Sequence, residues 1–258
     1  MAIFDTHGDM CHRPGLEAAF EFAKYWKPEI RIAGGDHFDL RPMRCGADER
    51  QERMNDDIEA GIEFLGTYSP TVLLLGNHED RLRQWVDRGG VYADLSSSIT
   101  KKIRLVLSDD CEQLEYCKAK GVWRLGHFNV VHGFGRGGIT SLKKHTETYG
   151  NVLMGHCHRN GFTRVGRHDA AIGFSSGCLC KLNMDYNRTQ LDTLAQSHGF
   201  MYGLLMPSGH VHVHQAYPVG DTWYLPTEMR EYTNSPCDCS GMDGGDSPSC
   251  GGAGEGES

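Results

Sequence analysis

The chain has 258 residues, of which 39% are hydrophobic and 23% charged, an ordinary composition for a globular protein with a sizeable core. No apolar run approaches the roughly 20 residues of a membrane-spanning helix, and the apolar start "MAIF" is too short for a signal peptide. The formal net charge is −8, and the segment 234–258 contributes five acidic residues to it and no Lys or Arg. The rest of the chain is therefore only mildly acidic. Net charge therefore neither proposes nor excludes a nucleic-acid substrate.

These features predict a cytoplasmic protein without a membrane partner. The ten cysteines are scattered and follow no secretion signal, so we expect reduced thiols and not disulfides.

Strand-like and helix-like patterns alternate over the first part of the chain. Apolar runs predict strands at 1–4, 29–36, 71–78 and 151–158, and a pair of strands over 121–133 that meet near Gly126. Helical spacing of apolar residues predicts helices at 16–26, 54–65, 79–88 and 139–149. This order predicts a βαβ-like first part.

From residue 170 onward the pattern changes to strands, at 170–177, 199–207 and 210–218, the last two joined by a Pro-Ser-Gly turn. We therefore expect one α/β domain over residues 1–226 whose second part is mixed or antiparallel. Beyond Tyr232 the chain has no Leu, Ile, Val, Phe, Trp or Tyr and is rich in Gly, Ser, Pro and Asp. Such a tail buries too little apolar surface to offset its ordering entropy, so we expect disorder over 227–258.

Five of the predicted strands end in potential metal ligands. In chain order these are Asp5 and His7, then Asp36 and Asp39 after Gly35, then "GNHE" at 76–79, then His132 before Gly133, and last "GHCH" at 155–158. Ligand sites of open α/β sheets form at the carboxyl ends of the strands. The series therefore predicts one metal site at that edge.

Asp-x-His, Gly-Asp-x-x-Asp, Gly-Asn-His-Glu, a strand-end His-Gly and Gly-His-x-His together resemble the calcineurin-like metallophosphoesterase superfamily, of the bacterial and phage type. The resemblance covers residues 5–158 and implies a four-layer αββα sandwich of two mixed sheets flanked by helices. It also implies two divalent metal ions, with Mn²⁺ expected first and Fe or Zn²⁺ as alternatives. Asp5, His7, Asp36 and His158 would hold one metal, and Asp36, Asn77, His132 and His156 the other.

The chemistry of phosphoryl transfer independently favours such a ligand set. Two cations about 3.5–4 Å apart clamp the attacking and leaving oxygens, and a bridging carboxylate is needed to hold them that close. Asp36 is the natural bridge, and a hydroxide between the metals would be the nucleophile. The resemblance further implies that His78 protonates the leaving oxygen and that Asp39 orients it. Arg81 is a candidate for phosphate binding, against the alternative of a solvated helix face.

The run "GHCH" also permits a softer site, in which Cys157 supplies a thiolate to zinc. Residues two apart along an extended strand end project to the same side, so His156 and His158 would face the metals and Cys157 would not. A zinc site through Cys157 is therefore the less favoured hypothesis.

Two departures from the serine/threonine phosphatase pattern favour the phosphodiesterase and nuclease-like branches. Leu40 follows Asp39 where those phosphatases have an arginine, with Arg41 one place late, and His158 is present. Glu79 favours the phosphatases mildly. The expected function is hydrolysis of phosphodiesters of a nucleotide or nucleic acid. The alternatives are a serine/threonine-type phosphoprotein phosphatase and a non-catalytic metal-binding interaction protein.

The remaining histidines and the tail cysteines suggest no further site. We expect a surface or packing role for His127, and a polar sheet face for His210, His212 and His214. Zinc binding by the tail would need a fourth ligand beside Cys237, Cys239 and Cys250, so we expect unpaired thiols there.

Overall fold

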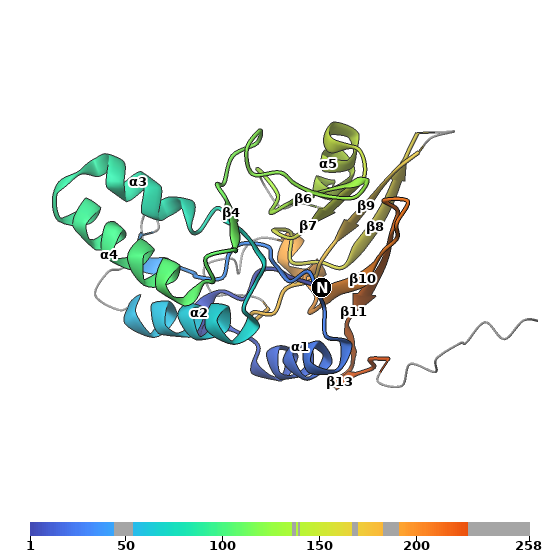
Figure 1. Ribbon diagram of the computed structural model, residues 1–258, viewed down its shortest axis with the longest axis horizontal. Coiled ribbons are helices and arrows are strands. Elements are labelled where there is room, and N and C mark those ends of the chain that lie inside the picture. Colours follow the sequence, from blue (N-terminus) through green and yellow to red (C-terminus); the bar gives the residue numbers. More distant parts are fainter. Residues whose placement is uncertain (44–53, 136–137, 139, 167–169, 183–190, 227–258) are drawn as a thin grey trace, which may run out of the picture. The chain divides into compact units, whose positions relative to one another are not determined.

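The computed structural model of the protein describes residues 1–43, 54–135, 138, 140–166, 170–182 and 191–226 (Figure 1). Met1–Leu225 forms one compact unit. The prediction of disorder over 227–258, and the tail cysteines, lie outside the described residues. Within the described part, no helix is long and apolar enough to cross a membrane.

The larger sheet has six strands in the order β11-β10-β1-β2-β3-β4. Four short parallel strands form one side of it: β1 (Ala2–Ile3), β2 (Ile32–Ala33), β3 (Val72–Leu74) and β4 (Glu112–Leu114). Parallel neighbours need crossover connections, which here are helical: α1 (Arg13–Trp26), α2 (Met54–Tyr68), and α3 (Asp80–Arg88) followed by α4 (Gly90–Val106). The antiparallel strands β10 (Phe200–Leu205) and β11 (Val211–Ala216) complete the sheet beside β1.

The second sheet has five strands in the order β5-β6-β7-β9-β8. These are β5 (Trp123–Leu125), β6 (Phe128–Val131), β7 (Val152–Met154), β8 (Gly161–Val165) and β9 (Ala171–Ser175). The expected pair of strands around Gly126 is confirmed as the β5–β6 hairpin. Strands β6, β7 and β9 run parallel, and α5 (Ser141–Tyr149) connects β6 to β7. A small hairpin of β12 (Pro218–Val219) and β13 (Thr222–Trp223) follows β11.

Alternating side chains of the strands fill three hydrophobic clusters. On one face of the larger sheet, Ile3 packs with residues of α1 and α2, such as Phe22 and Leu65. On its other face, Phe4 packs in a cluster that also contains Val130 and Leu153 of the second sheet. The outer face of the second sheet packs Val131, Val152 and Met154 with Leu142 of α5.

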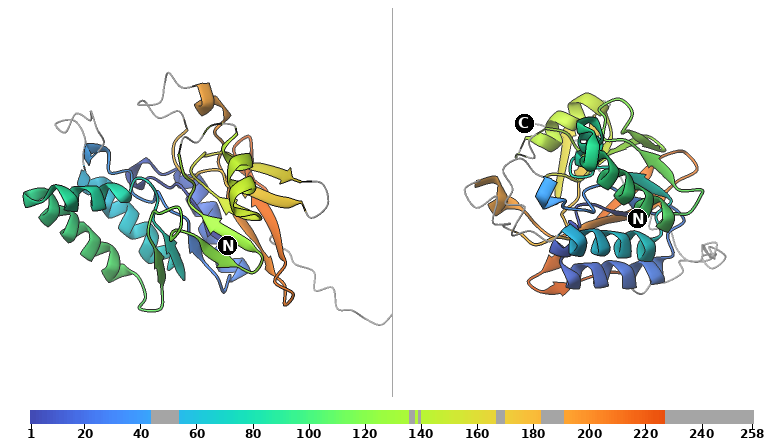
Figure 2. Two further views of the ribbon diagram at one scale, coloured as in Figure 1. Left: turned by 90° about the horizontal axis from the view of Figure 1, so that it is seen from above. Right: turned by 90° about the vertical axis from the view of Figure 1, so that its left-hand side faces the viewer.

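The clusters show two mixed sheets in contact with each other, with helices on their outer faces. Figures 1 and 2 show α1 and α2 together on one side of the sheets and α5 on the opposite side. The described chain is therefore a mixed α/β protein with two mixed sheets and five α-helices. This arrangement is compatible with the expected αββα sandwich.

Two sequence-based expectations need correction. Helix α4 is not predicted by the spacing analysis, because its buried positions are few: Ser96, Ile99 and Ile103 are the buried residues within it. The chain around His156 and His158 is not extended, because both residues have left-handed backbone angles, with φ of 66° and 50°. The expectation for Cys157 is that it projects away from the two histidines. It packs in the cluster under α5, and bends in the backbone place it there, not the alternation of a strand.

Candidate metal centre

The structure gathers the seven predicted ligands at the carboxyl ends of five strands. Three of these strands belong to the larger sheet and two to the second sheet. Asp5 and His7 follow β1, Asp36 follows β2, Asn77 follows β3, His132 follows β6, and His156 and His158 follow β7. Four of them are almost inaccessible to solvent, with exposed fractions of 0–2%: Asp5, His7, Asp36 and His132. The β1–β2 pairing and the contact between the two sheets produce this convergence of residues up to 153 positions apart.

Five of the seven predicted ligands have a left-handed backbone: Asp5, His7, Asp36, His156 and His158, with φ between 50° and 66°. Residues other than glycine rarely adopt this conformation, which costs about 1–3 kcal/mol each where it is strained. Backbone hydrogen bonds between the two neighbouring loops hold it, such as Asp5 N to the Gly35 carbonyl at 3.0 Å and His7 N to the Asp36 carbonyl at 3.0 Å. Strain concentrated in this way is characteristic of binding and catalytic sites.

Each of the two buried carboxylates has one oxygen fixed by a backbone N–H. Asp36 Oδ1 accepts from the His78 amide at 2.8 Å, which leaves Oδ2 facing His132 Nε2 at 3.2 Å. Asp5 Oδ2 accepts from the His156 amide at 2.8 Å. Asp5 Oδ1 is fully buried, has no hydrogen-bond partner, and lies 3.5 Å from His158 Nε2. A buried anionic oxygen without a hydrogen bond is costly, so it needs a positive charge beside it, either a protonated His158 or a bound cation.

The four histidines among the predicted ligands each have one ring nitrogen facing another protein group. His7 Nδ1 contacts the Asp39 carboxylate at 3.0 Å, and His132 Nδ1 contacts the Gly34 carbonyl at 2.9 Å. His158 Nδ1 faces Cys180 and Gln196, and His156 Nε2 contacts the Gly135 carbonyl at 2.7 Å. Such outer contacts fix the ring and its tautomer, which leaves the opposite nitrogen available to a metal.

The donor atoms form overlapping groups. One group contains Asp5, His7 and Asp36, and another contains Asp36, His132 and His156, with the ligand atoms of each group within 4.8 Å of one another. Asn77 Oδ1 lies 3.3 Å from His132 Nε2, and His158 Nε2 lies 3.2 Å from His7 Nε2. Asp36 therefore belongs to both groups, as a bridging carboxylate would. Carboxylate, imidazole and amide donors in this number fit two divalent transition-metal ions.

His78 and Asp39 lie beside this cluster. His78 Nδ1 is 2.9 Å from Asp39 Oδ1 and 2.8 Å from the Asp39 carbonyl, while His78 Nε2 is 3.8 Å from Asp36 Oδ2. Asp39 is buried, which alone raises its pKa, but its hydrogen bonds with His7 and His78 outweigh burial and hold the pKa well below its usual range. The sequence predicts that Asp39 orients His78; in the structure the same carboxylate contacts His7 as well.

The two arginines near Asp39 both contact the surrounding loops. Arg41 binds Asp39 Oδ2 at 3.1 Å and both carboxylate oxygens of Asp9 at 2.8 Å. Arg81 Nη1 donates to the carbonyls of Asp39 and Leu40, at 2.6 and 3.3 Å. Arg81 thus supports the loop that carries Asp39, and its role in phosphate binding stays a prediction.

Two buried acids that hold the ligand loops were not assigned a role from the sequence. The Glu79 carboxylate accepts backbone N–H bonds from Gly76, Asp36, His37 and Phe38, so it ties the end of β2 to the end of β3. Asp57 of α2 accepts from the amides of Asp39 and Leu40 at 2.8 and 2.6 Å. Gly76 is required at its position because a side chain there would collide with the Asp36 carboxylate. In the sequence, the position of Glu79 directly after Asn77 and His78 was the feature that could have assigned it to the site.

The histidines for which the sequence predicts no metal-binding role lie away from the centre. His127 is exposed at the β5–β6 turn and contacts the Ser208 carbonyl at 2.9 Å. His210, His212 and His214 are exposed along β11. They share one face of the strand, as expected.

Without a metal, the cluster pairs its two carboxylates with imidazolium groups. Burial lowers the pKa of His132, but the Asp36 carboxylate outweighs burial and raises it to about 9. Burial also lowers the pKa of His158, but the nearby Asp5 carboxylate outweighs burial and raises this pKa well above its usual value. Burial and the charge of His132 lower the pKa of His156 to about 4. At neutral pH, His132 and His158 therefore carry the protons that a metal must displace.

We therefore expect metal binding near pH 7 to release about two protons, because coordination needs the neutral imidazoles of His132 and His158. The affinity for Mn²⁺ should rise with pH up to about 9, the pKa of His132. Calorimetric titration with Mn²⁺ in buffers of different ionisation enthalpy measures the number of protons released. His132→Gln should reduce the number by about one, whereas His127→Gln should leave it unchanged. Binding without proton release would show that these imidazoles are not ligands.

A comparison of the chain with protein-family models and with curated proteins gives no match. The geometry of the site is thus the observation from which a function is proposed.

Proposed function

We propose that the protein is a dinuclear metal-dependent phosphoesterase that hydrolyses phosphodiester bonds of a nucleotide or nucleic acid, on a metallophosphoesterase-type αββα scaffold. The observation that carries this proposal is the position of Asp36, whose carboxylate belongs to two groups of buried potential ligands. Two bound cations would polarise the phosphoryl oxygens and lower the pKa of water between them. The unpartnered Asp5 Oδ1 supports the presence of a cation.

In this proposal, the side chains of the two groups would hold the metal ions, and His78 would supply the proton that the leaving oxygen takes up. Its Nδ1 is held by Asp39 at 2.9 Å, so Nε2 is the atom that faces the site. A proton on Nε2 can pass to the leaving oxygen, as general acid catalysis requires. Asp39 stabilises the protonated ring and keeps it in place.

The arginines support a diester in preference to a monoester. A monoester dianion is ordinarily bound by a planar arginine fork. The Arg41 guanidinium is 13% exposed and forms ion pairs with Asp9 and Asp39, and Arg81 donates to two backbone carbonyls. Both arginines thus stabilise the loop after β2. A monoanionic diester has less need of such a clamp.

The test is hydrolysis of a substrate panel by the Mn²⁺-reconstituted protein: an aryl phosphodiester, the matching monoester, cyclic nucleotides, DNA and a phosphopeptide. We expect a higher kcat/KM for the diester than for the monoester, two metal ions per chain by elemental analysis, and loss of activity on chelation. His158→Gln should lower diesterase activity more than monoesterase activity, and the exposed His127→Gln should change neither. A tenfold or greater preference for the monoester or the phosphopeptide would replace this proposal by a phosphoprotein phosphatase.

A further inference from the structure

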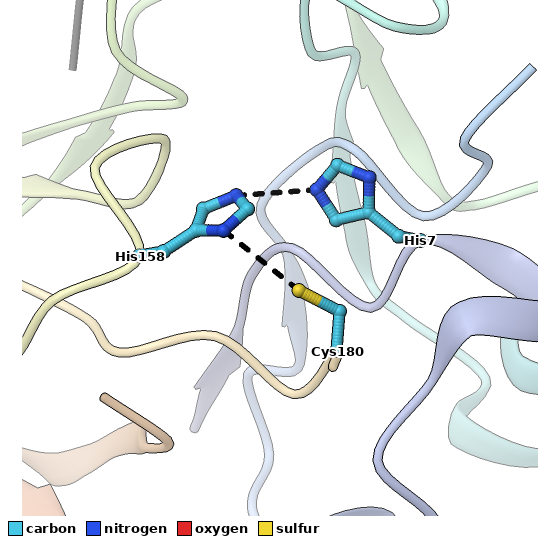
Figure 3. Close-up of side chains that lie close together, drawn as sticks. All are labelled: His7, His158 and Cys180. Atoms are coloured by element: carbon cyan, nitrogen blue, oxygen red, sulfur yellow. Dashed lines mark hydrogen bonds between the residues drawn. The ribbon is translucent and has the colours of Figure 1, made fainter. Parts of the chain in front are cut away.

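A buried cysteine sulfur lies beside two of the proposed metal ligands. Cys180 is fully inaccessible to solvent, and its Sγ lies 3.8 Å from His158 Nδ1. Potential ligand atoms of His7, His158 and Cys180 all lie within 4.8 Å of one another. Figure 3 shows the three side chains close together on separate segments of the chain, with His158 between its two contacts, to the Cys180 sulfur through Nδ1 and to His7 through Nε2.

The backbone explains why a thiol reaches this place. After β9 the chain runs beside the loop that follows β1: Leu179 N donates to the Asp5 carbonyl at 3.1 Å, and Cys11 and Cys180 form an antiparallel bridge. In such an extended run, successive side chains alternate between two sides. Leu179 packs in the cluster with α1 and α2, whereas Cys178 and Cys180 lie on the other side in a small cluster of their own.

We propose that Cys180 is a thiolate ligand of the metal position formed by Asp5, His7 and His158. The inference rests on the proposed function for the existence of a metal there. In a tetrahedral zinc site, metal–nitrogen distances of about 2.0–2.1 Å and a metal–sulfur distance of about 2.3 Å place the ligand atoms roughly 3.3–3.6 Å apart. The Nε2 atoms of His7 and His158 are 3.2 Å apart, and the Cys180 sulfur lies within 4.8 Å of a ligand atom of each ring.

A second observation points to the same position independently of the sulfur. Asp5 Oδ1 is buried without a hydrogen-bond partner and lies 3.5 Å from His158 Nε2. Asp5 and His7 also belong to one group of potential ligands. Together with the shared Asp36 carboxylate, Asp5, His7, His158 and Cys180 thus offer two carboxylates, two imidazoles and one thiolate to this position.

Two neighbouring cysteines do not fit this role. Cys157, although it lies between His156 and His158, packs among apolar residues under α5. Cys178 Sγ lies 3.9 Å from the Cys180 carbonyl and 3.8 Å from the Ser197 carbonyl. Within the described segments, Cys180 is the cysteine that belongs to a group of three potential ligands.

The sulfur would make the two metal positions chemically different. Thiolate is a soft ligand that favours Zn²⁺ or Fe²⁺ over Mn²⁺, whereas Asp36, Asn77, His132 and His156 offer only oxygen and nitrogen. The Cys180 thiol releases its proton to solvent when the metal binds. The centre would therefore take a thiophilic ion at the first position and remain permissive at the second.

Cobalt substitution tests the inference on the whole chain. Co²⁺ is added stoichiometrically to metal-free protein under a phosphine reductant, and the absorption spectrum is recorded. Visible d–d bands report bound Co²⁺ with any ligands, and a near-ultraviolet charge-transfer band reports a thiolate ligand. We expect both in the wild type, and complete loss of the near-ultraviolet band with retention of visible bands in Cys180→Ser. The matched variants Cys157→Ser and Cys178→Ser should keep both, with circular dichroism confirming that each variant is folded.

The outcomes separate this inference from the proposed function. Bound Co²⁺ with visible bands but no charge-transfer band in the wild type would overturn the thiolate ligand and leave the metal centre intact. A band that is lost in Cys178→Ser but kept in Cys180→Ser would also overturn it. Failure to bind Co²⁺ at all would overturn both proposals. If Cys180→Ser does not fold, Cys180→Ala is measured in its place, and a band that survives in Cys180→Ala overturns the inference.

Discussion

Replacement of His78 by Asn is expected to lower kcat for a phosphodiester by about 10²–10⁴ while both metal ions stay bound. The structure places His78 Nε2 3.8 Å from Asp36 Oδ2, at the edge of the shared group, with Nδ1 held by Asp39. Asn removes the proton donor but keeps the backbone N–H that binds Asp36 Oδ1. The measurements are single-turnover kinetics and the metal content of the purified variant.

Leaving-group dependence distinguishes a lost acid from a distorted site. Substrates whose leaving group has a low pKa need little protonation, so the loss should shrink for them and reach its full size for alkyl esters. His127→Asn provides the control, because His127 is exposed and its ring contacts the Ser208 carbonyl in the β10–β11 turn, away from the centre. His7, Asp39 and His78 also form a group of potential ligands. If His78→Asn loses one metal equivalent, His78 is a ligand and the assignment as acid is wrong.

The order of the strand-end motifs was sufficient to predict which residues converge. Asp5, Asp36 and Asn77 follow neighbouring parallel strands, and the carboxyl ends of such strands meet at one edge. The alternation of apolar runs also predicted the strands that bring His132 and His156 to the same place. These predictions depend on local pattern and on a general rule of sheet topology, both of which a single sequence carries.

What could not be predicted depends on contacts between distant segments. Cys180 reaches His158 because the chain after β9 pairs with the loop after β1, and no motif marks that pairing. Glu79 holds the amide of Asp36, which is 43 residues away, and this contact follows from the packing of two loops. The left-handed angles of His156 and His158 likewise arise from the loops around them, because this conformation is uncommon for residues other than glycine.

Replacement of Asp36 by Asn is expected to have the largest effect of any single change in the centre. The variant should lose at least one of the two metal ions, and kcat/KM for the diester should fall by about 10³-fold or more, because each cation contributes several kcal/mol of transition-state stabilisation. The Asn side chain is nearly isosteric with Asp, and its oxygen can still accept the hydrogen bond from the His78 backbone N–H. We therefore expect the loop to keep its conformation. It carries no charge with which to bridge two cations.

Thermal unfolding separates a lost bridge from a lost fold. Ions that bind only the folded state raise the Tm, so saturating Mn²⁺ should raise the Tm of the wild type and have a much smaller effect on Asp36→Asn. The metal-free variant should be less stable than the metal-free wild type, because the carboxylate that pairs with His132 and raises its pKa to about 9 has been removed. The comparison is therefore made on the Mn²⁺-dependent rise in Tm within each protein. Asp80→Asn is the matched control, since Asp80 pairs with the exposed Arg83 on α3 and should keep both the activity and the metal-dependent rise. Full metal content and an undiminished Mn²⁺-dependent rise in Tm for Asp36→Asn would show that Asp36 does not bridge two ions, and the dinuclear centre would have to be abandoned.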